Sequence, residues 1–233
     1  MARKKIVLFI VEGITDQESL ELLLGEFIGH NNRVIFEVVG GDITTNNNVD
    51  RANIKNKITD IIKDGGKRKF TPSDYLEVIH LIDMDGAFIS HENIYLDESL
   101  NKFVYKEEGI YAKSIEKVIE RNNIKKDLLN LLISTNKVYR SVPYRAFYFS
   151  CNLEHVLHNK MGIDDEEKIK YAQKFQDRYI DDLEGFIDLF CKSEMSVEKA
   201  YKDSWEFIKK DNNSIKRYTN LNILLNEYLS QEK

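Results

Sequence analysis

The stretch IVLFIVEGITD, residues 6–16, decides the fold class. Its first six residues are aliphatic or aromatic without a break, which is typical of a strand buried on both faces of a parallel sheet. The run stops at Glu12, and Thr15 followed by Glu18 predicts an N-cap and a capping box. Apolar residues then recur at helical spacing as far as Ile28. We therefore predict a strand, a short turn and a helix.

The same alternation continues along the chain. Residues 34–39 predict a second strand, residues 54–62 a second helix and residues 78–82 a third strand. This order is the signature of a parallel sheet with right-handed crossovers. A long helix over 114–133 and a fourth core strand over 146–149 extend the pattern. The predicted fold class is α/β, a Rossmann-like parallel sheet flanked by helices.

The rest of the chain differs in character. Residues 88–111 show no clear periodicity and are expected to be irregular, with room for a short hairpin. From Asp164 onward, amphipathic helical stretches follow one another. We therefore expect a catalytic core over residues 1–160 and a helical region over residues 161–233.

Composition narrows the function class only slightly. The chain has 233 residues, of which 42% are hydrophobic and 31% charged, so a packed core can form. No apolar run reaches the roughly 18 residues of a membrane span, and no secretory signal is evident. Two cysteines, Cys151 and Cys191, fit a reducing cytoplasm. The net charge of −5 counts mildly against a protein that coats nucleic acid.

Acidic residues stand at the ends of two predicted strands. Glu12 follows the first strand, and Asp83 and Asp85 follow the third. Ligands of open parallel sheets bind at the carboxyl ends of the strands, and magnesium prefers such carboxylate oxygens. A metal held there can activate a phosphodiester for hydrolysis. The alternative is that these acids only cap helices.

Two motifs resemble the Toprim domain of topoisomerases, primases and small nucleases. They are IVEGITD, residues 10–16, and LIDMDG, residues 81–86. The resemblance implies that Glu12 is a general acid/base or a metal ligand. It also implies that Asp83 and Asp85 bind Mg²⁺ or Mn²⁺. Asp16 lies in the first motif, where a metal contact and capping of the first helical turn are equally open.

A third segment, SCNLEHVL over residues 150–157, resembles the Asp-Leu-Glu segment of overcoming-lysogenization-defect nucleases. There the acids serve a second metal, which implies this role for Glu154. Asn152 stands where that pattern has an acid. Within the Toprim group, the length of this chain and its two cysteines favour a small nuclease over a topoisomerase or a primase.

The resemblance also extends to standalone Toprim proteins of phage-defence and abortive-infection systems. Some of these proteins work beside an ABC-type ATPase. The present chain has no Gly-x-x-x-x-Gly-Lys-Ser/Thr loop, so such an ATPase would be a separate partner.

Basic and sulfur- or nitrogen-bearing side chains supply further candidates. Lys137, Arg140 and Arg145 precede the fourth core strand and are our predicted contacts to the phosphates of DNA or RNA. A second basic cluster occupies residues 63–69, and either cluster can instead be a solvated surface. Cys151, His155 and His158 fall at the spacing of one helical face, which suits zinc, although no fourth ligand is evident.

Two other functions compete with a nuclease. The Asp83-Met84-Asp85 sequence also resembles the nucleophile motif of haloacid-dehalogenase-type phosphohydrolases, although Ala87 stands where that family has Thr. A non-catalytic Toprim-like sensing or scaffold module is the rival from a different class. The missing acid at Asn152 keeps that reading open.

Overall fold

The computed structural model describes residues 3–64 and 70–231. The chain forms two compact units, each assembled from three separate segments. The first unit contains residues 1–82, 128–147 and 172–186, and the second contains residues 83–127, 148–171 and 187–233. The expected helical C-terminal region therefore contributes to both units.

The first unit carries most of the main sheet. Within the described residues, five strands lie in the order β2-β1-β3-β8-β7. β1 is parallel to both β2 and β3, whereas β7 and β8 are antiparallel. The sheet is thus mixed but mostly parallel, as in a Rossmann-like α/β fold, and the predicted fold class is confirmed. The strands are β1 (Lys5–Val11), β2 (Asn32–Val38), β3 (Tyr75–Asp83), β7 (Lys137–Val138) and β8 (Val142–Phe149).

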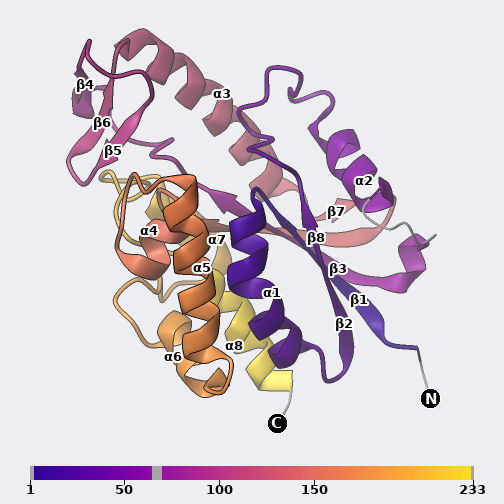
Figure 1. Cartoon of the computed structure of the whole chain (residues 1–233). Coiled ribbons are helices and arrows are strands. Elements are labelled where there is room, and N and C mark those ends of the chain that lie inside the picture. Colours follow the sequence, from indigo (N-terminus) through magenta and orange to yellow (C-terminus); the bar gives the residue numbers. More distant parts are fainter. Residues whose placement is uncertain (1–2, 65–69, 232–233) are drawn as a thin grey trace. The chain divides into compact units, whose positions relative to one another are not determined.

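The hydrophobic runs explain these strands. Every residue of β1 from Ile6 to Val11 is buried, as expected for a central strand with helices on both faces. The two crossover helices are α1 (Ile14–Ile28) and α2 (Ile54–Asp64). Right-handed crossovers to strands on either side of β1 place these helices on opposite faces of the sheet, as Figure 1 shows.

The start of α1 differs from the sequence-based expectation. The N-cap residue is Gly13, not Thr15, so the predicted capping box with Glu18 is wrong. The carboxylate of Asp16 accepts a hydrogen bond from the Gly13 backbone N–H at 2.8 Å. An acidic side chain in the first helical turn also complements the helix dipole, so Asp16 stabilises this turn.

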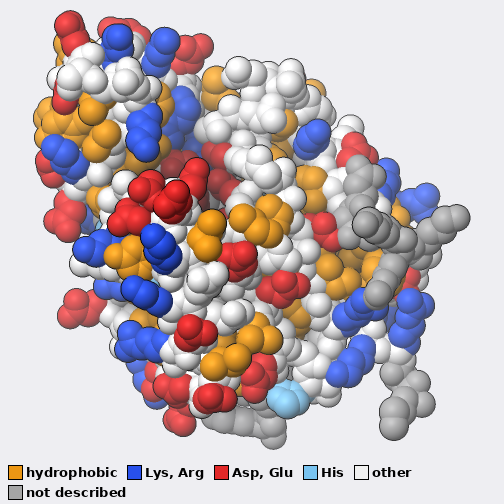
Figure 2. Space-filling model, viewed as in Figure 1, with side chains coloured by type: hydrophobic (Ala, Val, Ile, Leu, Met, Phe, Trp, Pro, Cys, Tyr) orange, Lys and Arg blue, Asp and Glu red, His pale blue; other side chains and the backbone are white. Residues whose placement is uncertain are grey.

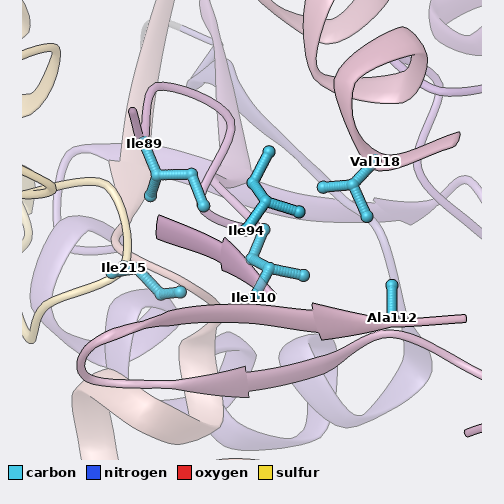
Figure 3. Packing of buried hydrophobic residues seen from close by; sticks show 6 residues of the cluster. All are labelled: Ile89, Ile94, Ile110, Ala112, Val118 and Ile215. Atoms are coloured by element: carbon cyan, nitrogen blue, oxygen red, sulfur yellow. The ribbon is translucent and has the colours of Figure 1, made fainter. Parts of the chain in front are cut away.

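The second unit contains a small sheet where irregular chain was expected. Its strands lie in the order β4-β6-β5, and β5 and β6 form the short antiparallel hairpin. Isoleucine side chains from this sheet and from the nearby loops form a compact apolar core, in which Ile110 is fully buried. Figure 3 shows the members of that core. The strands are β4 (Ile94–Leu96), β5 (Val104–Lys106) and β6 (Gly109–Ala112).

Helices dominate the remainder of the chain. They are α3 (Ile115–Ser134), α4 (Leu153–His158), α5 (Asp165–Tyr179), α6 (Leu183–Cys191), α7 (Tyr201–Ile208) and α8 (Leu221–Gln231). The C-terminal part is helical as expected, except that Thr219 forms isolated β-bridges with Phe149 and Ser196. Among the described residues, no helix has the length and apolar character needed to cross a membrane.

Candidate functional site

The predicted acids belong to different parts of the fold. Glu12 directly follows β1 in the first unit, and Asp16 lies in the first turn of α1. Asp83 is the last residue of β3 and the first residue of the second unit, which also contains Asp85. Glu154 lies on α4 in that same unit. The second unit therefore holds three of the five predicted acids, and their surroundings can be described together.

Backbone hydrogen bonds fix the turn that carries the two aspartates. Met84 N–H donates to the Phe149 carbonyl at 2.9 Å, and Asp85 N–H donates to the Cys151 carbonyl at 2.8 Å. Asp85 and Gly86 both have positive φ angles, of 48° and 63°. A Cβ at Gly86 would lie 3.1 Å from the Ile110 side chain, so both backbone conformation and packing favour glycine there. The Asp-x-Asp-Gly pattern thus has a local structural cause.

Asp83 lies against the start of α4. Its Oδ1 accepts a hydrogen bond from the backbone N–H of Leu153 at 3.0 Å. Asn152 is the N-cap residue of that helix, and its side-chain oxygen accepts from His155 N–H at 2.9 Å. The amide therefore performs the capping role that an acid could also perform at this position.

Asp85 is surrounded by positive charge from α3. The Lys125 side chain is fully buried, and its Nζ lies 2.7 Å from Asp85 Oδ2. Arg121, one helical turn earlier, places Nη1 3.8 Å from the same oxygen. The Arg121 guanidinium also lies over the Phe103 ring, while its Nε and Nη2 are buried and make no hydrogen bond. Two cations therefore face this one carboxylate.

Glu154 is a buried carboxylate, and only one of its two oxygens has a polar partner. Its Oε1 lies 3.1 Å from Lys168 Nζ. Its Oε2 is shielded from solvent and has no hydrogen-bond partner. Buried polar atoms are nearly always hydrogen-bonded, because desolvation without a partner is costly. An additional cation near Oε2 is one way to satisfy this oxygen.

The thiol of Cys151 is buried and belongs to the second unit, which also holds the three acids. Burial raises the pKa of Cys151 well above its ordinary value, and the negative charges of Asp85, Asp83 and Glu154 raise it further. The thiol therefore stays protonated at neutral pH. All three carboxylates therefore lie within electrostatic range of this thiol, although in the described part of the chain they form no group that could hold a metal ion.

The ligand type in this region, carboxylate oxygen, suits a hard divalent cation. Carboxylate oxygens are the preferred ligands of magnesium, and Glu154 supplies a buried oxygen that lacks a partner. Two observations point the other way. Across residues 3–64 and 70–231, no group of three or more His, Cys, Asp or Glu side chains is close enough to hold a metal ion. In addition, the Lys125 ammonium group donates a hydrogen bond to Asp85 Oδ2. A metal ion bound to Asp85 would have to compete with this ammonium group.

The predicted phosphate contacts differ in their availability. Lys137 and Arg140 are exposed. Arg145 is half-buried and binds Glu77 through Nη2 at 2.9 Å and Nε at 3.2 Å. The same guanidinium lies over the Phe147 ring. Arg145 therefore has a structural role within the first unit.

The zinc interpretation is not supported. Cys151 precedes α4 and has a positive φ of 57°, so it does not share a helical face with His155 and His158. Within residues 3–64 and 70–231, no cluster of three His, Cys, Asp or Glu side chains could hold a metal ion. His158 packs against the Tyr171 ring, with the centroids 4.8 Å apart.

Sequence reasoning missed three cations of the second unit, namely Arg121, Lys125 and Lys168. A signal for Lys125 was present, because this lysine lies on the same helical stripe as the buried Val118 and Leu129. A lysine on an apolar stripe indicates a buried charge that needs an acidic partner. Lys168 is not a fully buried charge of this kind, because its side chain is 30% exposed.

Comparisons with models of known protein families, with curated proteins and with solved structures found no match to this chain.

Proposed function

We propose that the chain is a metal-dependent nuclease of the Toprim type that hydrolyses phosphodiester bonds of DNA or RNA. The observation that carries the proposal is the buried Glu154 Oε2, a carboxylate oxygen without a hydrogen-bond partner in the same unit as Asp83 and Asp85. In this proposal, Asp83 and Asp85 hold Mg²⁺ or Mn²⁺, and Glu154 assists a second ion. A bound metal would supply Lewis acidity to the phosphodiester.

The side chains of the protein supply the remaining functions. Glu12 moves a proton, as the resemblance of residues 10–16 implies. Lys125 and Arg121 bring positive charge to Asp85, and a substrate phosphate provides an alternative negative partner for Arg121, the less buried of the two. The tight turn after β3 holds the two aspartates in place before substrate arrives, which lowers the cost of organising the site.

Cleavage assays test the catalytic part of the proposal. Labelled DNA and transfer RNA are incubated with magnesium, manganese or EDTA, using wild type, Asp83→Asn and Glu12→Gln. We expect metal-dependent cutting that falls at least about 100-fold in both variants, the scale of a lost acid/base or ligand group. Asp188→Asn is the control, because Asp188 is an exposed acid that pairs with Lys192. Equal cutting by all four proteins would disprove the assigned site.

A non-catalytic sensing or scaffold module is the second candidate. Two observations favour it. The Lys125 ammonium group donates a hydrogen bond to Asp85, and in the described part of the chain no group of three or more His, Cys, Asp or Glu side chains could hold a metal ion. Magnesium titration by calorimetry separates the two functions. Binding by wild type that Asp83→Asn abolishes supports the nuclease, whereas no binding by either protein supports the scaffold.

The phosphate monoester p-nitrophenyl phosphate tests the haloacid-dehalogenase alternative. In that chemistry, Asp83 would attack phosphorus, and Asp85 would protonate the leaving group. A nuclease of the proposed type cleaves the diester substrate and leaves the monoester intact. Rapid monoester hydrolysis without diester cleavage would favour the phosphohydrolase.

The proposed biological role is phage defence, alone or with an ABC-type ATPase partner. It is supported only by the resemblance of the motifs to those of defence-associated Toprim proteins. Plating efficiency of phages on cells that express wild type or Asp83→Asn tests this role. Protection that requires Asp83 supports it. Equal plating on cells with and without the protein, whether or not the ATPase partner is co-expressed, contradicts it.

A further inference from the structure

A basic pocket lies at the amino-terminal ends of the parallel strands in the first unit. Its volume is about 380 Å³, within the range of about 300–1,000 Å³ that is typical of small-ligand sites. Glu12 lies at the opposite end of β1, so the pocket is separate from the predicted catalytic edge of the sheet. Figure 2 shows Lys and Arg side chains gathered near the start of β1. The lining includes Arg3, Lys4, Asn32, Arg33, Phe70 and Asp74.

The charge of this pocket is opposite to that of the whole chain. Three cations line it against a single carboxylate, although the protein carries a net charge of −5. The carboxylate, Asp74, already binds Arg3, with Nη1 and Oδ1 3.1 Å apart. Hydrogen bonds from Thr71 hold the pKa of Asp74 below its ordinary value, so it remains ionised and anchors Arg3. The remaining positive charge favours an anionic ligand.

One wall of the pocket offers a flat stacking surface. The Arg33 guanidinium lies over the Phe70 ring, 5.5 Å from its centroid. Such planar groups stack on nucleobases, and arginine adds a cation–π contribution. Beside this wall, Lys4 donates one hydrogen bond to the Gly29 carbonyl. An ammonium group has three donors, so two further donors of Lys4 can serve a ligand.

We propose that this pocket binds a nucleotide, with the base stacked on the Arg33–Phe70 wall and the phosphate bound by Arg3 and Lys4. The ligand is a free mononucleotide or one nucleotide of a single strand, because both present the same base and phosphate. A volume of about 380 Å³ is more than a phosphate ion alone requires. The inference goes beyond the nuclease proposal, because the pocket contains none of the proposed metal ligands.

Binding is measured by fluorescence anisotropy with a fluorescein-labelled single-stranded oligonucleotide. EDTA is present throughout, so that cleavage cannot occur. Arg33→Gln and Phe70→Leu should each weaken binding about 10-fold, and raised salt should weaken binding by wild type. Arg178→Gln is the matched control, because Arg178 is an exposed arginine of the same unit that also lies over a ring, that of Tyr179. This control should bind as wild type does.

Competition identifies the source of the ligand. Displacement of the oligonucleotide by adenosine monophosphate indicates a mononucleotide site, and resistance to displacement with loss in Arg33→Gln indicates a strand-binding site. Either result supports the proposal. Inorganic phosphate that competes as well as the mononucleotide would overturn the stacking role of the wall. Unchanged binding by both pocket variants would overturn the whole proposal.

The outcome is independent of the nuclease proposal. Asp83→Asn should bind the oligonucleotide in EDTA as tightly as wild type does, because Asp83 is not part of the pocket. If Asp83→Asn loses cleavage activity and still binds the oligonucleotide, both proposals are supported. If wild type cleaves nucleic acid and both Arg33→Gln and Phe70→Leu bind the oligonucleotide normally, only the pocket proposal is overturned.

Discussion

Single side chains decide which of the predicted residues are available to a substrate. Arg145 has the sequence context of a phosphate contact, but its guanidinium binds the Glu77 carboxylate within the first unit. Lys137 and Arg140 remain exposed on the same segment. An arginine that is already paired and half-buried contributes to stability, whereas an exposed lysine costs little to redirect toward a ligand.

Arg145→Gln should destabilise the protein and leave nucleic-acid binding unchanged. The substitution removes the guanidinium that pairs with the Glu77 carboxylate, whose side chain is 12% exposed. We expect a loss of about 1–3 kcal/mol in the free energy of unfolding, measured by urea titration. The double variant Glu77→Gln/Arg145→Gln should recover part of this loss. Weakened oligonucleotide binding with unchanged stability would show that Arg145 contacts phosphate.

Glu37 should make stability depend on pH. Burial, with a smaller effect of Glu21, raises the pKa of Glu37 from 4.5 to about 7. Between these values the unfolded chain has lost the proton and the folded protein has kept it, so stability falls as pH rises from about 4.5 to about 7. Glu37→Gln should remove this decline and be more stable than wild type at pH 8. Parallel stability curves for the two proteins would contradict the assignment.

At the scale of elements, the sequence predicted well those strands and helices that have continuous or regularly spaced hydrophobic residues. β1 and α1 follow from the buried strand pattern and the helical spacing after it. The small sheet was missed because its strands have only three or four residues, too few to show alternation. The Gly13 cap was missed because glycine has no side chain to signal capping. The Gly13 N–H instead donates to the carboxylate of Asp16, three residues later.

The candidate site was only partly predictable for a different reason. Asp83, Asp85 and Glu154 could be selected because strand ends and short motifs are local in sequence. Their partners Lys125 and Lys168 come from other helices, at positions that only the tertiary fold relates to the acids. Local pattern therefore identifies the acids, and long-range packing determines which cations neutralise them.

The short helix α4 depends on its N-cap. Asn152 Oδ1 accepts the His155 N–H, so Asn152→Ala should cost about 0.5–2 kcal/mol of unfolding free energy. Asn152→Asp should keep the cap and the stability, because aspartate caps helices about as well. Urea unfolding compares the three proteins. If Asn152→Asp proves as unstable as Asn152→Ala, repulsion from the neighbouring acids outweighs the cap.

At the scale of the whole molecule, both units are discontinuous in sequence. The chain passes from one unit to the other five times, as the segment boundaries show. Residues beyond 160 supply buried side chains to each unit, including Phe186 in the first and Trp205 in the second. Tyr148 and Trp205 pack with their ring centroids 4.9 Å apart. A division of the chain at residue 160 therefore removes core from both units.

A fragment of residues 1–160 should fail to fold cooperatively. Burial of each large apolar side chain contributes about 1.5–3 kcal/mol, and a typical domain is stable by only about 5–15 kcal/mol. Loss of Phe175, Phe186, Trp205 and Leu224, all buried in the full chain, removes a stabilisation comparable to this whole margin. Urea unfolding followed by circular dichroism should give a sharp transition for the full chain and a broad, non-cooperative one for the fragment. A sharp transition in the fragment would instead establish residues 1–160 as an autonomous core and assign the helices beyond them an accessory role.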